Sequence, residues 1–405
     1  MPAKRAVRLA DVHGASRLVI ELTLLVTGLV ETVHHNIVRR PGIWGPATLE
    51  PTSGITGLVY RSIRGITRLV GGTIDVALAP LVPLFAEHDD SPRRDAVVAA
   101  LNGVLGDRLA ATGNPLALPM RLCAGGVAID LEPEAIAKAL GAPRERVVVL
   151  VHGLCLNDRQ WKRGGHDHGK SLARDLAANA LYLRYNSGQH ISTNGAEFAG
   201  LLDVLVASWP VPLREIVLVG HSMGGLLIRS AFAVGQAQEQ TWPGLVRALV
   251  FLGAPHHGAP LERGGHGLDK ILAASPYTVA FTRLPQLRSA GITDLRHGSV
   301  QDADWADHGR FEHAADRRHP LPLPAGVPCY AVAASLDAEP QHTRRKHLGD
   351  GLVPVASALG RHRNPRMDLG VPPERQWVAW GTGHLDLLRS AAAYRQIKRW
   401  LVARA

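Results

Sequence analysis

One segment constrains the fold more than any other. Residues 216–228 read Ile-Val-Leu-Val-Gly-His-Ser-Met-Gly-Gly-Leu-Leu-Ile: a β-branched run, the motif Gly-x-Ser-x-Gly with His221 as its first x, and a helical pattern. A strand that bends this sharply into a helix projects the Ser222 hydroxyl above the sheet edge. The neighbouring backbones then come too close for side chains at Gly220 and Gly224. The segment therefore predicts a strand–turn–helix unit that exposes Ser222 as a nucleophile at a helix N-terminus, whose positive end stabilises developing negative charge.

Apolar runs alternate with helical patterns over the second half of the chain. Strand-like runs occupy residues 147–151, 180–185, 216–219, 248–252, 330–334 and 376–380. Helical patterns occupy residues 195–208, 223–236 and 385–402. This alternation predicts an α/β fold with a mostly parallel sheet and helices on both faces. A short strand pair within residues 118–131 is expected to lead into it.

A serine hydroxyl is a weak nucleophile at neutral pH and needs a base, which in turn needs an orienting acid. In this topology the acid and then the histidine follow the serine, at later strand ends. His384 follows the last predicted strand and a Gly-rich loop, which is where the base is needed. Asp350, in a tight turn after the penultimate strand, is the preferred acid. Asp337, nearer the end of that strand, is the alternative.

Two backbone N–H groups are expected to bind the oxyanion of the tetrahedral intermediate. One belongs to Met223, directly after the nucleophile. The other comes from the loop after the strand at 147–151, where Leu154 follows the flexible Gly153. Cys155 has no strand–turn–helix frame of its own, so we interpret it as a small packing residue rather than a second nucleophile.

These motifs together resemble the α/β-hydrolase superfamily, and more narrowly its bacterial lipase- and esterase-like members. The matching pieces fall between residues 145 and 402: His152-Gly153-Leu154 with Trp161 downstream, 220–225, 252–258, 349–354 and 383–384. The piece at 252–258 is similar to the Thr-Pro-His-His-Gly segment of lipases, with Ala254 in place of the threonine. The resemblance implies a catalytic triad and an oxyanion hole made by Ser222, Asp350, His384, Leu154 and Met223. It also implies that no metal and no organic cofactor takes part.

The expected function is hydrolysis of a carboxylic ester, of a small molecule or a lipid, through an acyl-enzyme intermediate. Acyl transfer or thioester hydrolysis on the same triad is one alternative. A lipid-binding or scaffold protein with a vestigial site is another.

Three regions are expected along the chain. Residues 1–90 form a helical region whose apolar positions recur at helical spacing, and residues 91–145 supply a linker, a helix and leading strands. Residues 146–405 form the catalytic domain, with a cap or lid insertion at about 258–324. The stripes within residues 1–90 could pack on the rest of the protein, mediate self-association or contact a membrane surface.

Composition and charge exclude other classes. The net charge of +10 favours acidic partners, but the basic clusters at 344–346 and 361–363 are short and aromatic residues make up only 5%, so we expect no nucleic-acid binding. Three widely spaced cysteines form neither a disulfide framework nor a zinc pattern. His166 and His168 lack further ligands at a usable spacing, so we expect no metal site there. With no recognisable secretion signal, we expect a cytoplasmic location, with or without peripheral membrane contact.

Overall fold

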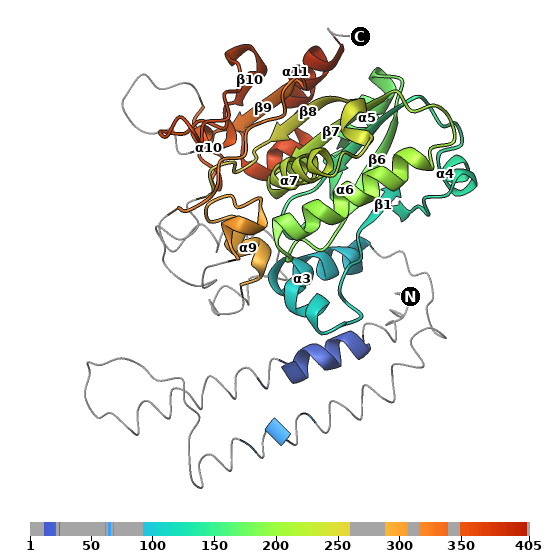
Figure 1. Cartoon of the computed structure of the whole chain (residues 1–405), viewed down its shortest axis with the longest axis vertical. Helices are drawn as coiled ribbons and strands as arrows, with labels where there is room; N and C mark the ends of the chain where they lie inside the picture. The colour runs from blue at the N-terminus through green and yellow to red at the C-terminus, as the bar shows by residue number, and fades with distance from the viewer. Residues whose placement is uncertain are drawn as a thin grey trace. The chain divides into compact units, whose positions relative to one another are not determined.

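The structure is a computed structural model that describes residues 12–21, 24, 61, 64–65, 68, 92–259, 288–306, 316–338 and 349–402. The chain divides into two units (Figure 1). One comprises Met1–Ser91 with Leu109–Ala117, and the other Pro92–Arg108 with Leu118–Ala405.

The first unit contains a helix at residues 12–21. Asn114 ties it to the chain further on, because its Nδ2 donates to the Gly14 carbonyl at 3.0 Å. Arg17 likewise donates to the carbonyls of Thr112 and Gly113. Most of the two predicted apolar stripes lie outside the described residues. No helix in the described part of the chain is long and apolar enough to cross a membrane.

The second unit is built on one sheet, whose strand order in the described residues is β10-β9-β8-β7-β3-β6-β1-β2. The parallel strands are β3 (Arg146–Val151), β6 (Asn179–Arg184), β7 (Glu215–His221), β8 (Val246–Leu252), β9 (Cys329–Ala334) and β10 (Gln376–Ala379). The short strands β1 (Arg121–Ala124) and β2 (Val127–Ala128) extend it antiparallel beyond β6. The six predicted strands and the leading strand pair are therefore confirmed.

Continuous apolar strands such as these need cover on both faces, because side chains alternate between them. On one face α7 (Met223–Ala237) contacts β3, β7 and β8, and α6 (Ile191–Ala207) packs against α7, as Figure 1 shows. On the other, α5 (His168–Asp175) and α11 (Ala391–Val402) bury the alternate residues of the strands in one apolar cluster. The predicted α/β fold with helices on both faces is confirmed.

Two predicted helices have different limits. The helix expected at 195–208 begins four residues earlier, at Ile191, because Ile191 and Asn194 are buried and belong to its packed face. The helix expected at 385–402 is two pieces, η8 (His384–Arg389) and α11, because Ser390 between them is extended.

The remaining described elements are α3 (Pro92–Ala111), α4 (Pro133–Leu140), η2 (Asp158–Trp161), β4 (Lys162–Arg163), β5 (His166–Asp167), η3 (Trp242–Leu245), α9 (Ala290–Asp294), η6 (Asp302–Asp304), α10 (Val355–Ala358) and η7 (Pro373–Arg375). The cap or lid insertion predicted at about 258–324 is described only in part, and residues 260–287 and 307–315 lie outside the described residues. Within its described portion, α9 packs against α6, and the Oγ of the preceding Ser289 donates to the Gly103 carbonyl of α3 at 2.6 Å.

Two glycines of α6 provide a matched test of its packing on α7. A Cβ at Gly195 would lie 2.2 Å from the Ser230 Oγ, whereas a Cβ at Gly200 would meet nothing within 4 Å. We expect Gly195→Ala to lower the free energy of unfolding by about 1–3 kcal/mol through overpacking. We expect Gly200→Ala to raise it by up to about 1 kcal/mol through helix propensity. Urea unfolding of both variants measures this, and equal shifts would contradict the packing described.

Candidate active site

Ser222 occupies a strained bend between β7 and α7. Its φ of 54° and ψ of −125° place a non-glycine residue in a region that costs about 1–3 kcal/mol. The surroundings leave no room for side chains at the flanking glycines. A Cβ at Gly220 would lie 2.6 Å from the carbonyl carbon of Gly224, and one at Gly224 would lie 2.2 Å from the Val151 carbonyl oxygen. The bend therefore requires glycine at both positions and directs the serine away from the sheet.

The loop after β3 lies directly beside this bend. β3 and β7 pair in parallel, with Val151 opposite Gly220, so the chain leaves both strands at the same sheet edge. A Cβ at Gly153 would be only 2.9 Å from the Ser222 Cβ. The N–H groups of Leu154 and Met223 donate no hydrogen bond to any residue in the described part of the chain. Two free backbone donors thus flank the serine.

Residues that follow β6 hold this loop in place from both ends. The Tyr185 hydroxyl donates to the His152 carbonyl at 2.9 Å, and the Tyr185 ring stacks on the His152 ring. The N–H of Cys155 donates to the Ser187 Oγ at 3.1 Å. Tyr185 and Ser187 were not predicted from the sequence, and no local pattern points to them, because they reach the loop only through the neighbouring strand.

His384 and Asp350 form a buried pair at the same edge. The His384 Nδ1 lies 2.7 Å from the Asp350 Oδ2, and both side chains are almost fully enclosed. The other carboxylate oxygen accepts the N–H groups of Leu352 at 3.0 Å and Val353 at 2.8 Å, which fixes the orientation of the carboxylate. Because a carboxylate accepts, the Nδ1–H donates, and a neutral His384 ring keeps a free lone pair on Nε2.

The alternative acid, Asp337, has other contacts. Its Oδ2 accepts the Ser335 hydroxyl at 3.0 Å, and its carbonyl accepts the Gly381 N–H at 2.8 Å. Of the two acids that the sequence left open, Asp350 is the one that contacts His384.

Ser222 and His384 line one pocket with a volume of about 80 Å³. Its walls are mainly apolar and come from several elements: Ala96, Gly153, Leu154, Cys155, Leu156, Gln160, Arg163, His221, Leu352 and Leu385 complete the lining. Ala96 belongs to α3, so this helix forms part of the wall. The sequence analysis missed the contributions of Ala96, Gln160 and Arg163.

His221, inside the motif, links the bend to the histidine loop. It is completely buried, and its Nε2–H donates to the His384 carbonyl at 3.1 Å. Burial lowers the pKa of His221 well below its usual value, with the charge of His384 as the next contribution. His221 is therefore a neutral partner that positions the backbone of His384.

Cys155 is buried beside the pocket, and burial raises the pKa of its thiol to about 12. A thiol is nucleophilic as its thiolate, so Cys155 stays unreactive at neutral pH. This agrees with its interpretation as a packing residue.

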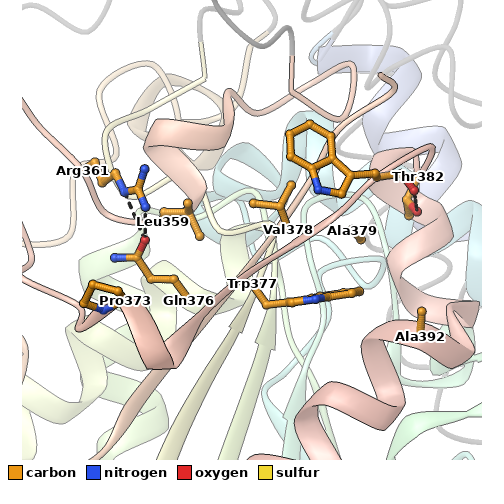
Figure 2. A pocket seen from close by; sticks show the side chains of 10 residues that line it. Leu359, Arg361, Pro373, Gln376, Trp377, Val378, Ala379, Thr382 and Ala392 are labelled. Carbon is orange, nitrogen blue, oxygen red and sulfur yellow. Dashed lines mark hydrogen bonds between the residues drawn. The ribbon is translucent and has the colours of Figure 1, made fainter. Parts of the chain in front are cut away.

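A second, larger hollow lies along the edge strand β10, with a volume of about 460 Å³ (Figure 2). Trp377, Val378 and Leu359 belong to its apolar lining, and at one end the Arg361 guanidinium donates to the Gln376 side-chain oxygen. Neither Ser222 nor His384 reaches this hollow, so the smaller pocket is the candidate active site.

Comparison with known proteins supports the fold. The family model of the PGAP1-like alpha/beta domain matches residues 142–315. The chain has an α/β-hydrolase fold. Together with the strand order and the bend at Ser222, this confirms at the level of the fold the resemblance drawn from the sequence.

Several solved structures are also similar. The mature lipase BlEst2 of Bacillus licheniformis is 17% identical over 65% of this chain and 95% of its own, with a TM-score of 0.42. A thermophilic esterase from Thermogutta terrifontis is 15% identical over 65% and 91%, with a TM-score of 0.36. Lipase B of Aspergillus fumigatus is 12% identical over 69% and 55%, with a TM-score of 0.39. No curated protein sequence matches the chain.

His166 and His168 make structural contacts rather than a ligand set. The His168 Nε2–H donates to the Leu387 carbonyl at 2.8 Å, and its Nδ1 lies 3.0 Å from the His166 Nε2. No group of three or more metal-binding side chains is assembled within the described residues. The pair joins β5 and α5 to η8.

The buried His168 makes stability depend on pH. Burial lowers its pKa to about 4, so as pH falls below about 6.5 the unfolded chain takes up this proton before the folded one. Its contribution to stability is therefore complete near neutral pH and is lost as pH falls from about 6.5 to 4. We expect His168→Gln to make the pH dependence of the unfolding free energy shallower in this range, by up to about 1.4 kcal/mol per pH unit. Urea unfolding at pH 7, 6 and 5 measures it.

His362→Gln, in the loop after α10, controls for the loss of a histidine that lies away from this contact. A slope for His168→Gln equal to that of the wild type would show that burial of His168 does not govern the response.

Proposed function

We propose that the protein is a serine hydrolase that cleaves carboxylic esters, with Ser222 as nucleophile, His384 as general base and Asp350 as the acid that orients it. The observation that carries the proposal is the 2.7 Å contact between His384 and Asp350 at the pocket that holds the strained Ser222. The match of residues 142–315 to an alpha/beta-domain family model supports the hydrolase class.

The reaction follows from these positions. The Nε2 of His384 accepts the hydroxyl proton as the Ser222 Oγ attacks the ester carbonyl, and Asp350 stabilises the charged imidazole. The carbonyl oxygen becomes an oxyanion. His384 then returns the proton to the leaving alcohol, which leaves an acyl group on the serine. A water molecule, deprotonated by His384, attacks this ester, and the carboxylic acid leaves as Ser222 regains its proton.

The N–H groups of Leu154 and Met223 are suited to bind the oxyanion. Each lacks an acceptor in the described part of the chain, and a donor of this kind contributes about 3 kcal/mol to transition-state stabilisation. The Tyr185 hydroxyl donates to the His152 carbonyl, and the Ser187 Oγ accepts the Cys155 N–H. These two bonds hold the loop that carries the Leu154 N–H in place before substrate arrives. The apolar walls formed by Leu156, Leu352 and Leu385 suit an acyl chain and exclude water.

Replacement of the nucleophile tests the proposal most directly. With a 4-nitrophenyl ester series of increasing acyl length, we expect Ser222→Ala to lower kcat by about 10⁴-fold or more, because the covalent step is lost. Wild-type turnover no faster than that of Ser222→Ala would contradict the proposal. A fluorophosphonate probe that labels the wild type and leaves Ser222→Ala unmodified provides an independent readout.

The acid can be tested with a matched pair of variants. Asp350→Asn keeps the shape but removes the charge that fixes the His384 tautomer, so we expect kcat to fall by about 10³–10⁴-fold. Asp337→Asn makes the same change on a carboxylate that contacts Ser335, and we expect less than a fewfold change. Steady-state hydrolysis of one 4-nitrophenyl ester compares them. A larger loss in Asp337→Asn than in Asp350→Asn would reverse the assignment.

A further inference from the structure

A cationic side chain stands in the wall of the candidate active site. Arg163, the last residue of β4, is half-buried and lines the same pocket as Ser222 and His384. It pairs with His166 in the hairpin of β4 and β5, and that hairpin contacts η8, which begins at His384. The backbone that carries Arg163 is therefore fixed relative to the catalytic groups.

Among the residues that the structure describes, Arg163 has no carboxylate partner, although acidic side chains are present on the surrounding elements. Each of these carboxylates already binds another side chain. Asp158 binds Arg184 at 2.7 Å, Asp95 binds Arg159 at 2.9 Å, Asp167 accepts the Tyr182 hydroxyl at 2.8 Å and Asp386 binds Arg389 at 2.7 Å. Within the described residues, no carboxylate oxygen lies within 4.0 Å of the Arg163 guanidinium. Its charge is therefore left uncompensated beside the pocket.

The charge of Arg163 acts on His221, the residue before Ser222. Burial is the largest cause of the lowered pKa of His221, and the charge of Arg163 adds to it. Because His221 directly precedes Ser222, the same field acts where a substrate would bind. The apolar side chains of Leu156, Leu352 and Leu385 share the wall, and low polarity strengthens the attraction between opposite charges.

Gln160 lies in η2, three residues before Arg163, and lines the same pocket. Its side-chain oxygen accepts the Asn157 N–H at 2.9 Å, which orients the amide. The amide nitrogen, with two N–H donors, has no partner in the described part of the chain. A cation and an amide donor in one wall are the groups that bind a carboxylate or a phosphate.

We propose, resting on the function proposed above, that the substrate is an ester that carries a second, anionic group, and that Arg163 determines this specificity by binding the anion. The anionic group of the substrate is a carboxylate or a phosphate that lies within a few bonds of the scissile ester. Arg163 touches the substrate away from the bond that breaks.

The test uses the full chain and two pairs of esters, and the members of each pair differ in one anionic group. The first pair, 4-nitrophenyl hydrogen glutarate and its methyl ester, places a carboxylate on the acyl side. The second, 1-butyryl-glycerol 3-phosphate and 1-butyryl-glycerol, places a phosphate on the alcohol side. The quantity measured is the ratio of kcat/KM for the anionic ester to that for its neutral partner.

For the wild type we expect this ratio to exceed 1 in at least one pair. The pair that gives this ratio shows whether the anionic group is a carboxylate on the acyl side or a phosphate on the alcohol side. Arg163→Gln should lower that ratio about tenfold, and Arg163→Glu should lower it further. Arg163→Lys should retain part of it. Arg366→Gln, which removes an exposed charge away from the pocket, should leave the ratio at the wild-type value.

A ratio that stays the same in Arg163→Gln and Arg163→Glu, or a wild-type ratio of 1 or less in both pairs, overturns the proposal. These outcomes differ from failure of the proposed function, in which the wild type hydrolyses every ester no faster than Ser222→Ala. Thermal unfolding of each variant confirms that the ratios compare folded proteins.

Discussion

The candidate site depends on a close approach of three backbone segments around Ser222. The serine adopts a positive φ. A Cβ at Gly220 would collide with the backbone of Gly224 and Gly225, and a Cβ at Gly224 would collide with the end of β3. The parallel pairing of β3 and β7 imposes this approach, because it brings the loop of Leu154 to the side of the nucleophile. The strain at one residue is compensated by the packing of the sheet around it, and it keeps the hydroxyl beside two free N–H donors.

His384 is tied both to this bend and to the turn that carries Asp350. The His221 ring, buried and neutral, donates to the His384 carbonyl, and the His384 N–H donates to the Asp350 carbonyl at 3.1 Å. A Cβ at Gly253 after β8 would lie 3.3 Å from both the Asp350 Oδ2 and the His384 ring. Asp350, His384 and Ser222 therefore lie at one packed edge of the sheet.

The walls of the pocket come from parts of the chain with no catalytic motif. Helix α3 lies before the segment that resembles the α/β hydrolases, yet its Ala96 lines the pocket and its Gly103 packs against Cys155. The hairpin of β4 and β5 places Arg163 in the wall of the pocket, where it adds a positive charge. Under the proposed function, the motifs supply the reacting groups, whereas the surrounding elements shape the pocket that receives the substrate.

The sequence by itself determined the strands, the bend and the identity of Ser222 and His384 as candidates, because β-branched runs and the Gly-x-Ser-x-Gly spacing are local signals. It favoured Asp350 without excluding Asp337, since both follow the same strand and only the folded turn brings one carboxylate to the His384 ring. Tertiary structure alone assigned Tyr185, Ser187 and Arg163 to the site. The order of strands in the sheet and the packing of a hairpin set those contacts, and no periodicity in the chain encodes either.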